Sequence, residues 1–204
     1  MFKNNIYYYI MEKLIDNKNT DKNTRHSYLE VYQNLFKEKK ETCKRILEIG
    51  LGDRQNIYGG SAKLWLDYFK NADVFILELL KEDFYKGDMI NTLKTYDHLK
   101  LFLGTNAYDL NFINNNLNYK FDIIIDDGPH SKVSMIKFIK YYLPLLADDG
   151  ILVIEDIKNL NWTKKFTSMI PNELKKYIEI YDLRKNKNRY DDILFILNKS
   201  KIID

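Results

Sequence analysis

Three side chains that can bind a cation or transfer a proton stand at the end of one apolar segment. In the stretch FDIIIDDGPHS (121–131), a mostly apolar run leads directly into Asp126 and Asp127, and His130 follows in the same loop. Such a run predicts a buried strand, and in open parallel sheets ligands bind at the carboxyl ends of the strands. These residues are therefore the first candidates for a functional site.

A second apolar segment supplies further carboxylates. GILVIED (150–156) ends in Glu155 and Asp156, and its distance from Asp127 along the chain leaves room for one crossover helix between adjacent parallel strands. Carboxylates brought together in this way raise one another's pKa unless a cation neutralises them. An oxygen-only ligand set suits a hard divalent ion, magnesium first.

His130 is the candidate proton acceptor. An unperturbed histidine, with a pKa of about 6.5, accepts a proton at neutral pH more readily than a carboxylate does. Its place shortly after Asp127 predicts that it faces the same crevice. Structural roles are the alternatives: a loop histidine is commonly a surface residue, and Asp126 or Asp127 can cap a helix that starts near Ser131.

Two other strand ends have features of a nucleoside site. Gly50 and Gly52 let the chain turn tightly after the apolar segment ILEI and come close to a ligand. Glu78 ends the next apolar segment, where a carboxylate can accept both hydroxyls of a ribose. Gln55 stands where the dinucleotide fingerprint has its third glycine, which favours a nucleoside without a pyrophosphate. The alternatives are that Gly50 and Gly52 form a plain tight turn and that Glu78 is a solvated strand end.

The elements that must position these residues alternate between short apolar and longer amphipathic segments, which predicts repeated β-α units around a parallel sheet. The third apolar segment ends before Thr105 and Asn106, whose side chains can bond an adenine edge. The predicted parallel strands are RILEIG (45–50), ADVFILEL (72–79), HLKLFLG (98–104), FDIIID (121–126) and GILVIED (150–156).

Helices are predicted between these strands. One covers 61–70 with Ser61 as its N-cap, and a second covers 133–146, where Pro144 should kink or shorten it. On this second helix, one apolar stripe is expected from Met135, Ile136, Ile139, Leu143 and Leu146. A further helix is predicted over 162–170.

The C-terminal part is predicted to form two strands without a helix between them. Segments 176–183 and 191–198 are predicted strands, and the short polar loop between them permits only an antiparallel pair. The fold class is therefore α/β, a mostly parallel seven-stranded sheet with helices on both faces and a C-terminal antiparallel hairpin. We expect one domain, 1–204, with an N-terminal helical cap region over 1–42 and the sheet core over 43–204.

Composition narrows the class of protein. The 204 residues carry a net charge of +3 that is interleaved along the chain, which argues against nucleic-acid and membrane partners. The N-terminal stretch lacks a secretory apolar region, and no segment has the roughly 20 apolar residues that span a bilayer. A single cysteine, Cys43, suits a reducing cytoplasm.

At these residues the chain resembles the class I S-adenosylmethionine-dependent methyltransferases with a Rossmann-like fold. Among them it resembles the metal-dependent sugar O-methyltransferases of the macrocin and mycinamicin type and the related cephalosporin-biosynthesis protein. The pairing of D-D-G-x-H with a later strand ending in E-D is more specific than E-x-G-x-G. The matching segments are TDKNTRHSY (20–28), ILEIGLG (46–52), YGGSAKLWLDYF (58–69), IDDGPH (125–130) and GILVIEDI (150–157).

The resemblance implies a Mg²⁺-dependent O-methyltransferase that uses S-adenosylmethionine to methylate a sugar hydroxyl of a glycan or glycosylated metabolite. It implies that Asp127, Glu155 and Asp156 hold the metal and that His130, beside Asp127, is the general base. The expected cofactor contacts, some from the strand-end pattern and some from the resemblance, are Tyr28, Glu48, Gly50, Gly52, Glu78, Thr105, Asn106 and Asp126, with His26 as a further candidate.

The chain also departs from the family pattern. Pro129 stands where serine is usual, and Thr105 where an acidic residue is frequent. A catechol-type O-methyltransferase and a non-catalytic nucleoside-binding module remain alternatives. A nucleic-acid adenine methyltransferase fits less well, because DDGPH occupies the place of its N-P-P-Y-like segment. The N-terminal helical region is a candidate interface for a homo-oligomer.

Overall fold

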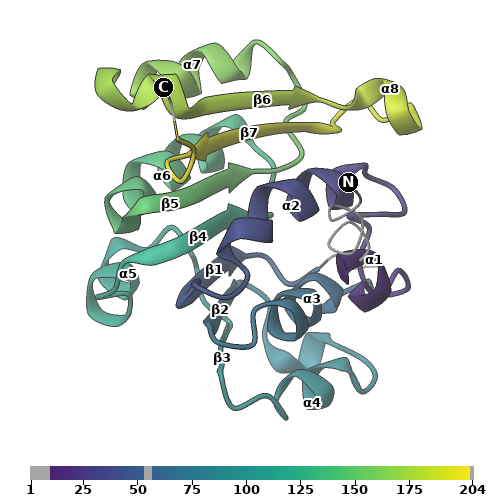
Figure 1. Cartoon of the computed structure of the whole chain (residues 1–204). Helices are drawn as coiled ribbons and strands as arrows, with labels where there is room; N and C mark the ends of the chain where they lie inside the picture. The colour runs from purple at the N-terminus through teal and green to yellow at the C-terminus, as the bar shows by residue number, and fades with distance from the viewer. Residues whose placement is uncertain (1–9, 53–56, 203–204) are drawn as a thin grey trace.

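One mixed sheet forms the centre of the molecule. The structure is a computed structural model that describes residues 10–52 and 57–202, and in these ranges seven strands lie in the order β3-β2-β1-β4-β5-β7-β6 (Figure 1). Neighbours among β1 to β5 pair in parallel, whereas β7 is antiparallel to both β5 and β6. The predicted fold class is confirmed. The strands are β1 (Arg45–Ile49), β2 (Asp73–Glu78), β3 (Leu99–Leu103), β4 (Phe121–Asp126), β5 (Leu146–Ile154), β6 (Ile178–Asp182) and β7 (Ile193–Asn198).

Helices cover both faces of this sheet, as Figure 1 shows. One apolar cluster joins α1, α2, α3 and α4 to one face, and a second joins α5, α6 and α7 to the other. The helices are α1 (Ile10–Leu14), α2 (Tyr28–Phe36), α3 (Gly60–Tyr68), α4 (Met89–Leu93), α5 (Leu110–Asn116), α6 (Lys132–Tyr142), α7 (Trp162–Met169) and α8 (Arg184–Lys187). Short 3-10 helices cover Lys37–Lys39, Glu82–Phe84, Leu143–Leu145 and Asn172–Tyr177.

The alternation of side chains along each strand decides which cluster a residue joins. Ile123 and Ile125 of β4 belong to the cluster under α1 to α4, while Ile124 between them belongs to the cluster under α5 to α7. All three are fully buried. Continuous apolar runs are therefore needed here, because both faces of each central strand are covered.

Three helix predictions can be compared with the structure. Pro144 lies in the 3-10 turn after α6, which ends at Tyr142, so the predicted shortening is confirmed. Leu146 does not continue the helical stripe; it begins β5 and pairs with Phe121. Ser61 is not an N-cap, because α3 begins one residue earlier and Gly59 takes the cap position.

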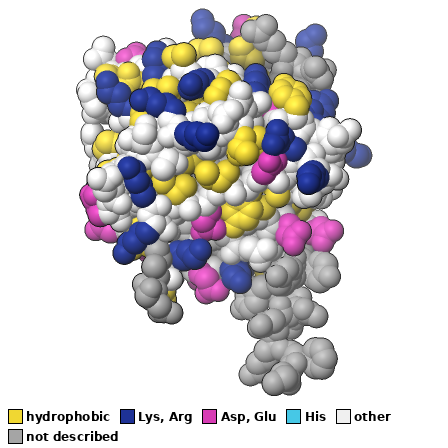
Figure 2. Space-filling model, turned by 90° about the horizontal axis from the view of Figure 1, so that it is seen from above, with side chains coloured by type: hydrophobic (Ala, Val, Ile, Leu, Met, Phe, Trp, Pro, Cys, Tyr) yellow, Lys and Arg dark blue, Asp and Glu magenta, His cyan; other side chains and the backbone are white. Residues whose placement is uncertain are grey.

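Two further expectations concern the chain's surface and ends. Seen from above, over β6 and α7, Lys and Arg side chains are scattered among hydrophobic ones and do not form a single stripe (Figure 2). Among the described helices, none is both long and apolar enough to cross a bilayer. The N-terminal stretch 1–9 and Gln55 lie outside the described residues.

Candidate functional site

Strand register brings the predicted site residues to one level of the sheet. Ile49 of β1 pairs with Leu77 of β2 and with Asp126 of β4, and Asp126 in turn pairs with Ile154 of β5. The residues that follow these partners therefore emerge side by side at the carboxyl edge. They are Gly50, Glu78, Asp127 and Glu155.

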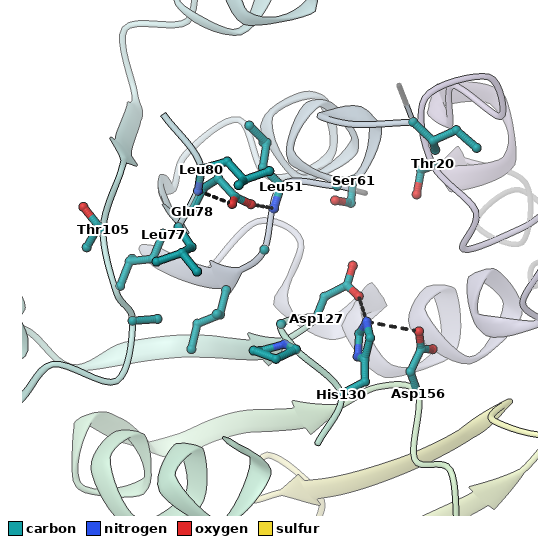
Figure 3. A pocket seen from close by; sticks show the side chains of 18 of the residues that line it. Thr20, Leu51, Ser61, Leu77, Glu78, Leu80, Thr105, Asp127, His130 and Asp156 are labelled. Atoms are coloured by element: carbon teal, nitrogen blue, oxygen red, sulfur yellow. Dashed lines mark hydrogen bonds and ion pairs between the residues drawn. The ribbon is translucent and has the colours of Figure 1, made fainter. Parts of the chain in front are cut away.

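His130 lies between two of the predicted carboxylates. Its Nε2 atom is 3.8 Å from Asp127 Oδ1 and 3.5 Å from Asp156 Oδ2 (Figure 3). Both His130 and Asp156 have positive φ angles, 49° and 54°, which non-glycine residues adopt at a cost. Strained conformations of this kind concentrate at functional sites.

The alternative in which an aspartate caps the following helix is wrong. The N-cap of α6 is Ser131, whose side chain accepts a hydrogen bond from the Ser134 backbone at 3.0 Å, and Ser134 completes a capping box. The Asp127 side chain is therefore not used to cap α6 and can bind other groups at the edge of the sheet.

A second acidic group contains a buried lysine. The Lys22 ammonium is 2.7 Å from Asp127 Oδ2, 2.7 Å from both oxygens of Glu155 and 3.4 Å from Glu48 Oε1. Tyr32 also donates a hydrogen bond to Glu155. Lys22 is 1% exposed, and Glu48 and Glu155 are equally buried.

The electrostatics show more negative charge than Lys22 alone balances. Burial raises the pKa of Glu48 to about 7, and burial together with repulsion from Asp127 raises the pKa of Asp156 to about 7. Burial also raises the pKa of Glu155, although Lys22 opposes the shift. Burial alone would lower the pKa of Lys22, but Asp127, Glu155 and Glu48 together raise it well above its ordinary value. Such a centre favours a further cation.

The donor set on the pocket side fits a divalent ion. One ligand atom each from Asp127, His130 and Asp156 can be chosen so that all lie within 4.8 Å of one another, and the same holds for Glu48, Asp127 and Glu155. Carboxylate oxygens are the ligands that Mg²⁺ prefers. Of the three expected metal ligands, Asp127 belongs to both groups, Asp156 to the first and Glu155 to the second.

A cavity of about 460 Å³ opens beside this centre. Glu78 lies at its wall, and its two oxygens accept hydrogen bonds from the backbone N–H groups of Leu51 and Leu80, at 2.8 and 2.7 Å (Figure 3). A carboxylate accepts about four hydrogen bonds, so Glu78 retains acceptor capacity for a ligand. The predicted site residues that line the cavity are Gly50, Gly52, Glu78, Thr105, Asn106, Asp127, His130 and Asp156.

Besides Glu155, four other predicted residues do not line this cavity. Tyr28 is fully buried and donates a hydrogen bond of 2.7 Å to Asp156 Oδ1. His26 stacks on Tyr28, and its Nδ1 lies 3.3 Å from Asp192 Oδ1. The others are Glu48, which is fully buried, and Asp126, whose Oδ1 accepts a hydrogen bond from Tyr108.

Sequence reasoning missed several residues that build the centre. Lys22 lies inside the segment TDKNTRHSY, which entered the sequence analysis only through the family resemblance, with His26 and Tyr28 as its candidate residues. Ser61 and Trp65 of α3 each donate a hydrogen bond of 3.0 Å to Glu48 Oε2. The signal for Ser61 and Trp65 was present, because they lie one helical turn apart and so share a face of α3.

Comparison with known proteins gives sugar O-methyltransferases as relatives. No protein-family model matches the chain. Over 140 residues, 68% of its length, the chain is 29% identical to a tetracenomycin rhamnosyl 3'-O-methyltransferase of Streptomyces olivaceus. It is 25% identical over 67% of its length to the mycinamicin VI 2''-O-methyltransferase of Micromonospora griseorubida. In each case the chain matches 33% of the relative, so it aligns with about a third of these curated relatives.

Solved structures show the fold. The MycE methyltransferase of mycinamicin biosynthesis, solved with Mg, S-adenosylhomocysteine and mycinamicin VI, superimposes with a TM-score of 0.68 at 18% identity, over 92% of this chain and 53% of MycE. A caffeoyl-CoA O-methyltransferase-like structure from Staphylococcus aureus gives 0.54 at 19% identity, over 84% and 82% of the two chains. The chain has the Rossmann-like fold of class I methyltransferases, and its resemblance to the sugar O-methyltransferases is confirmed.

Proposed function

We propose that this chain, with its class I methyltransferase fold and its similarity to sugar O-methyltransferases, is an S-adenosylmethionine- and Mg²⁺-dependent O-methyltransferase that acts on a sugar hydroxyl. The observation that carries the proposal is the position of His130 between Asp127 and Asp156, beside a cavity walled by Glu78. A metal-binding diol site and a nucleoside site would then meet at one edge of the sheet.

The cofactor would lie in the cavity along the first three strand ends. Gly50 and Gly52 allow the backbone to approach it closely, and Glu78 would accept the ribose hydroxyls. Thr105 and Asn106 would contact the adenine edge. Three of the predicted residues would act indirectly, by hydrogen bonds that hold the residues and strands in contact with the cofactor and metal; they are Tyr28, Glu48 and Asp126.

The carboxylates Asp127 and Asp156, with Glu155 next to them, would hold the metal ion. A bound Mg²⁺ ion lowers the pKa of a coordinated sugar hydroxyl, and S-adenosylmethionine supplies the methyl group. His130 would accept the hydroxyl proton at Nε2, the ring atom that faces Asp127 and Asp156. Asp127 would then act twice, as a metal ligand and as a negative charge 3.8 Å from Nε2 that stabilises protonated His130.

The acceptor is inferred from the relatives, whose names specify rhamnosyl, mycinamicin and olivosyl sugars. We therefore propose a glycosylated metabolite or glycan as acceptor. The fold equally accommodates a catechol-type O-methyltransferase, as the caffeoyl-CoA neighbour illustrates. A cytoplasmic location follows from the proposed use of S-adenosylmethionine, and neither a nucleic acid nor a membrane is needed as a partner.

An acceptor panel tests the proposal. The purified chain would be incubated with methyl-labelled S-adenosylmethionine and three acceptor types: a rhamnosylated aromatic polyketide, a macrolide bearing a deoxysugar, and a catechol. We expect label in the sugar, lost with EDTA and restored by Mg²⁺. Methylation of the catechol alone would replace the sugar assignment, and cofactor binding without transfer to any acceptor would favour a binding module.

A further inference from the structure

Tyr190, at 63% exposed, is the most exposed aromatic side chain of the described residues. It lies in the loop between β6 and β7, shortly before β7 begins at Ile193. The carbonyl oxygen of the next residue, Asp191, lies 3.3 Å from the Tyr28 hydroxyl, which donates to Asp156 Oδ1 at 2.7 Å. The charge of Asp191 raises the pKa of Tyr190, and Asp156 contributes in the same direction. Tyr190 therefore lies within electrostatic range of a proposed metal ligand.

The loop is fixed on both sides of the Tyr190 ring. Arg189 Nη2 lies 3.2 Å from Asp191 Oδ2 and 3.3 Å from His26 Nε2. Asp192 Oδ1, on the other side, lies 3.3 Å from His26 Nδ1. Because the backbone is held in this way and a tyrosine side chain has only two rotatable χ angles, the ring loses little conformational entropy when it contacts a ligand.

The polar side chains around Tyr190 are engaged within the protein. Arg189 and Asp192 contact His26, and Lys187 Nζ donates to the His26 carbonyl at 2.7 Å. They do not offer a row of donors and acceptors for the many hydroxyls of a free glycan. The loop instead presents an aromatic ring to solvent at this point.

Other exposed apolar side chains belong to loops at the same edge of the sheet. β4, β5 and β7 are neighbours, so the loops after β4 and β5 and before β7 leave the same edge. Val133, in the first turn after the β4 loop, and Leu160, after β5, are both exposed. Figure 1 shows α8, which precedes Tyr190, on the side of the molecule to which β4 and β5 point. This edge is therefore apolar beyond its carboxylates.

We infer that Tyr190 belongs to the acceptor subsite, where its ring packs against an apolar group attached to the reacting sugar. The acceptor is then a sugar on an apolar metabolite and not a free hydrophilic glycan. A sugar whose hydroxyl reaches His130 and the carboxylates has its attached group directed outward, along the edge that Tyr190 borders. The inference rests on the proposed function and specifies its acceptor class.

Two glycosides that share one sugar test the inference without turnover. Methyl α-L-rhamnoside and phenyl α-L-rhamnoside carry the sugar of the rhamnosylated acceptor in the panel above and differ only in the attached group. Each would be titrated calorimetrically into the full chain in the presence of S-adenosylhomocysteine and Mg²⁺. We expect the phenyl glycoside to bind about tenfold more tightly, because one aromatic contact adds to the apolar area that it buries.

Variants of Tyr190 separate the ring from its hydroxyl. Tyr190→Ser should reduce the preference for the phenyl glycoside to about twofold or less, whereas Tyr190→Phe should keep it. The Kd for S-adenosylhomocysteine should be unchanged in both variants, which shows that the cofactor site is intact. The control is Tyr119→Ser, because Tyr119 is also exposed but lies just before β4, at the opposite edge of the sheet, and should not affect the preference.

Three results would overturn the inference: equal affinities of the two glycosides for the unaltered chain, binding of neither, or an unchanged preference in Tyr190→Ser. An unchanged preference together with a lower molar mass of Tyr190→Ser in light scattering would assign the ring to contact with a second copy of the chain. Failure of the proposed function is separate, because it would appear as an unaltered chain that binds no S-adenosylhomocysteine.

Discussion

Asp126 and Asp127 are consecutive in the sequence but serve opposite faces of the sheet. Asp126 follows the register of Ile124 and turns toward Tyr108, on the side of α5 to α7. Asp127 turns to the other side, toward Lys22 and His130. The two-residue period of a strand requires this separation, so one acid of the pair faces the proposed metal centre and the other does not.

Replacement of His130 should affect the chemical step alone. For His130→Ala we expect methyl transfer to fall about 100- to 10,000-fold, the usual contribution of a general base, with the Kd for S-adenosylhomocysteine unchanged. The matched control is His98→Ala, a histidine just before β3 at the opposite end of the strands, with Nε2 3.4 Å from the Leu66 carbonyl. Transfer at the unaltered rate in His130→Ala would remove the base assignment.

At the scale of elements, the turn after β1 determines how closely the cofactor can approach. Gly50 has a φ of 99°, and a Cβ atom there would lie 2.1 Å from the Asp127 carbonyl oxygen. The ends of β1 and β4 are thus in contact through backbone atoms, and only glycine fits between them. The turn that lines the cavity and the strand that carries Asp127 therefore depend on each other.

Gly50→Ala should separate this close contact from the effect of the backbone angle. We expect S-adenosylhomocysteine to bind at least about tenfold more weakly, which corresponds to about 1.4 kcal/mol, because the clash must move one strand end. Gly87→Ala is the control: φ at Gly87 is 100°, but a Cβ atom there would meet only Tyr58 Oη at 3.6 Å. Equal affinities in the two variants would show that the contact is unimportant for the cofactor.

The attachment of α2 to the sheet can be tested by an aromatic truncation. Phe36 is fully buried and packs on Trp65 and Phe69, with ring centroids 5.7 and 5.8 Å away. We expect Phe36→Ala to lower the free energy of unfolding by about 3–5 kcal/mol, measured by urea denaturation. Phe84→Ala, at a site 56% exposed, should change it little. A small effect in Phe36→Ala would mean that α2 contributes little to stability.

At the scale of the whole molecule, sequence patterns predicted the sheet better than they predicted the centre of the site. The strand ends at Asp127 and Glu155 follow from local apolar runs, and the parallel arrangement follows from their alternation with helices. The burial of Lys22 could not be predicted in this way. Lys22 lies in a polar segment, and it is buried only because the folded chain packs this segment against Asp127 and Glu155, which are distant in sequence. Ser61 is a second residue whose role the sequence alone did not predict. Its hydroxyl is typical of a helix N-cap, but in the folded chain it donates a hydrogen bond to Glu48.

The reactivity of the Cys43 thiol tests whether the core is packed as the structure shows. It is fully buried just before β1, and burial, with Asp122 nearby, raises the pKa of its thiol to about 12. Because the thiolate is the reactive form, the folded protein should resist iodoacetamide at about pH 8, whereas the chain unfolded in urea should be alkylated once. Mass spectrometry of the intact protein measures this, and rapid alkylation of the folded chain would contradict the burial.

A calorimetric titration of S-adenosylhomocysteine, followed by Mg²⁺, into the unaltered chain and into Asp127→Asn tests whether the carboxyl edge of the sheet is a metal-dependent methyltransferase site. We expect S-adenosylhomocysteine to bind both proteins with one site each, and the subsequent Mg²⁺ binding to be present in the first and lost in the second. If the folded, unaltered chain binds no S-adenosylhomocysteine, the carboxyl edge of the sheet is not a methyltransferase site.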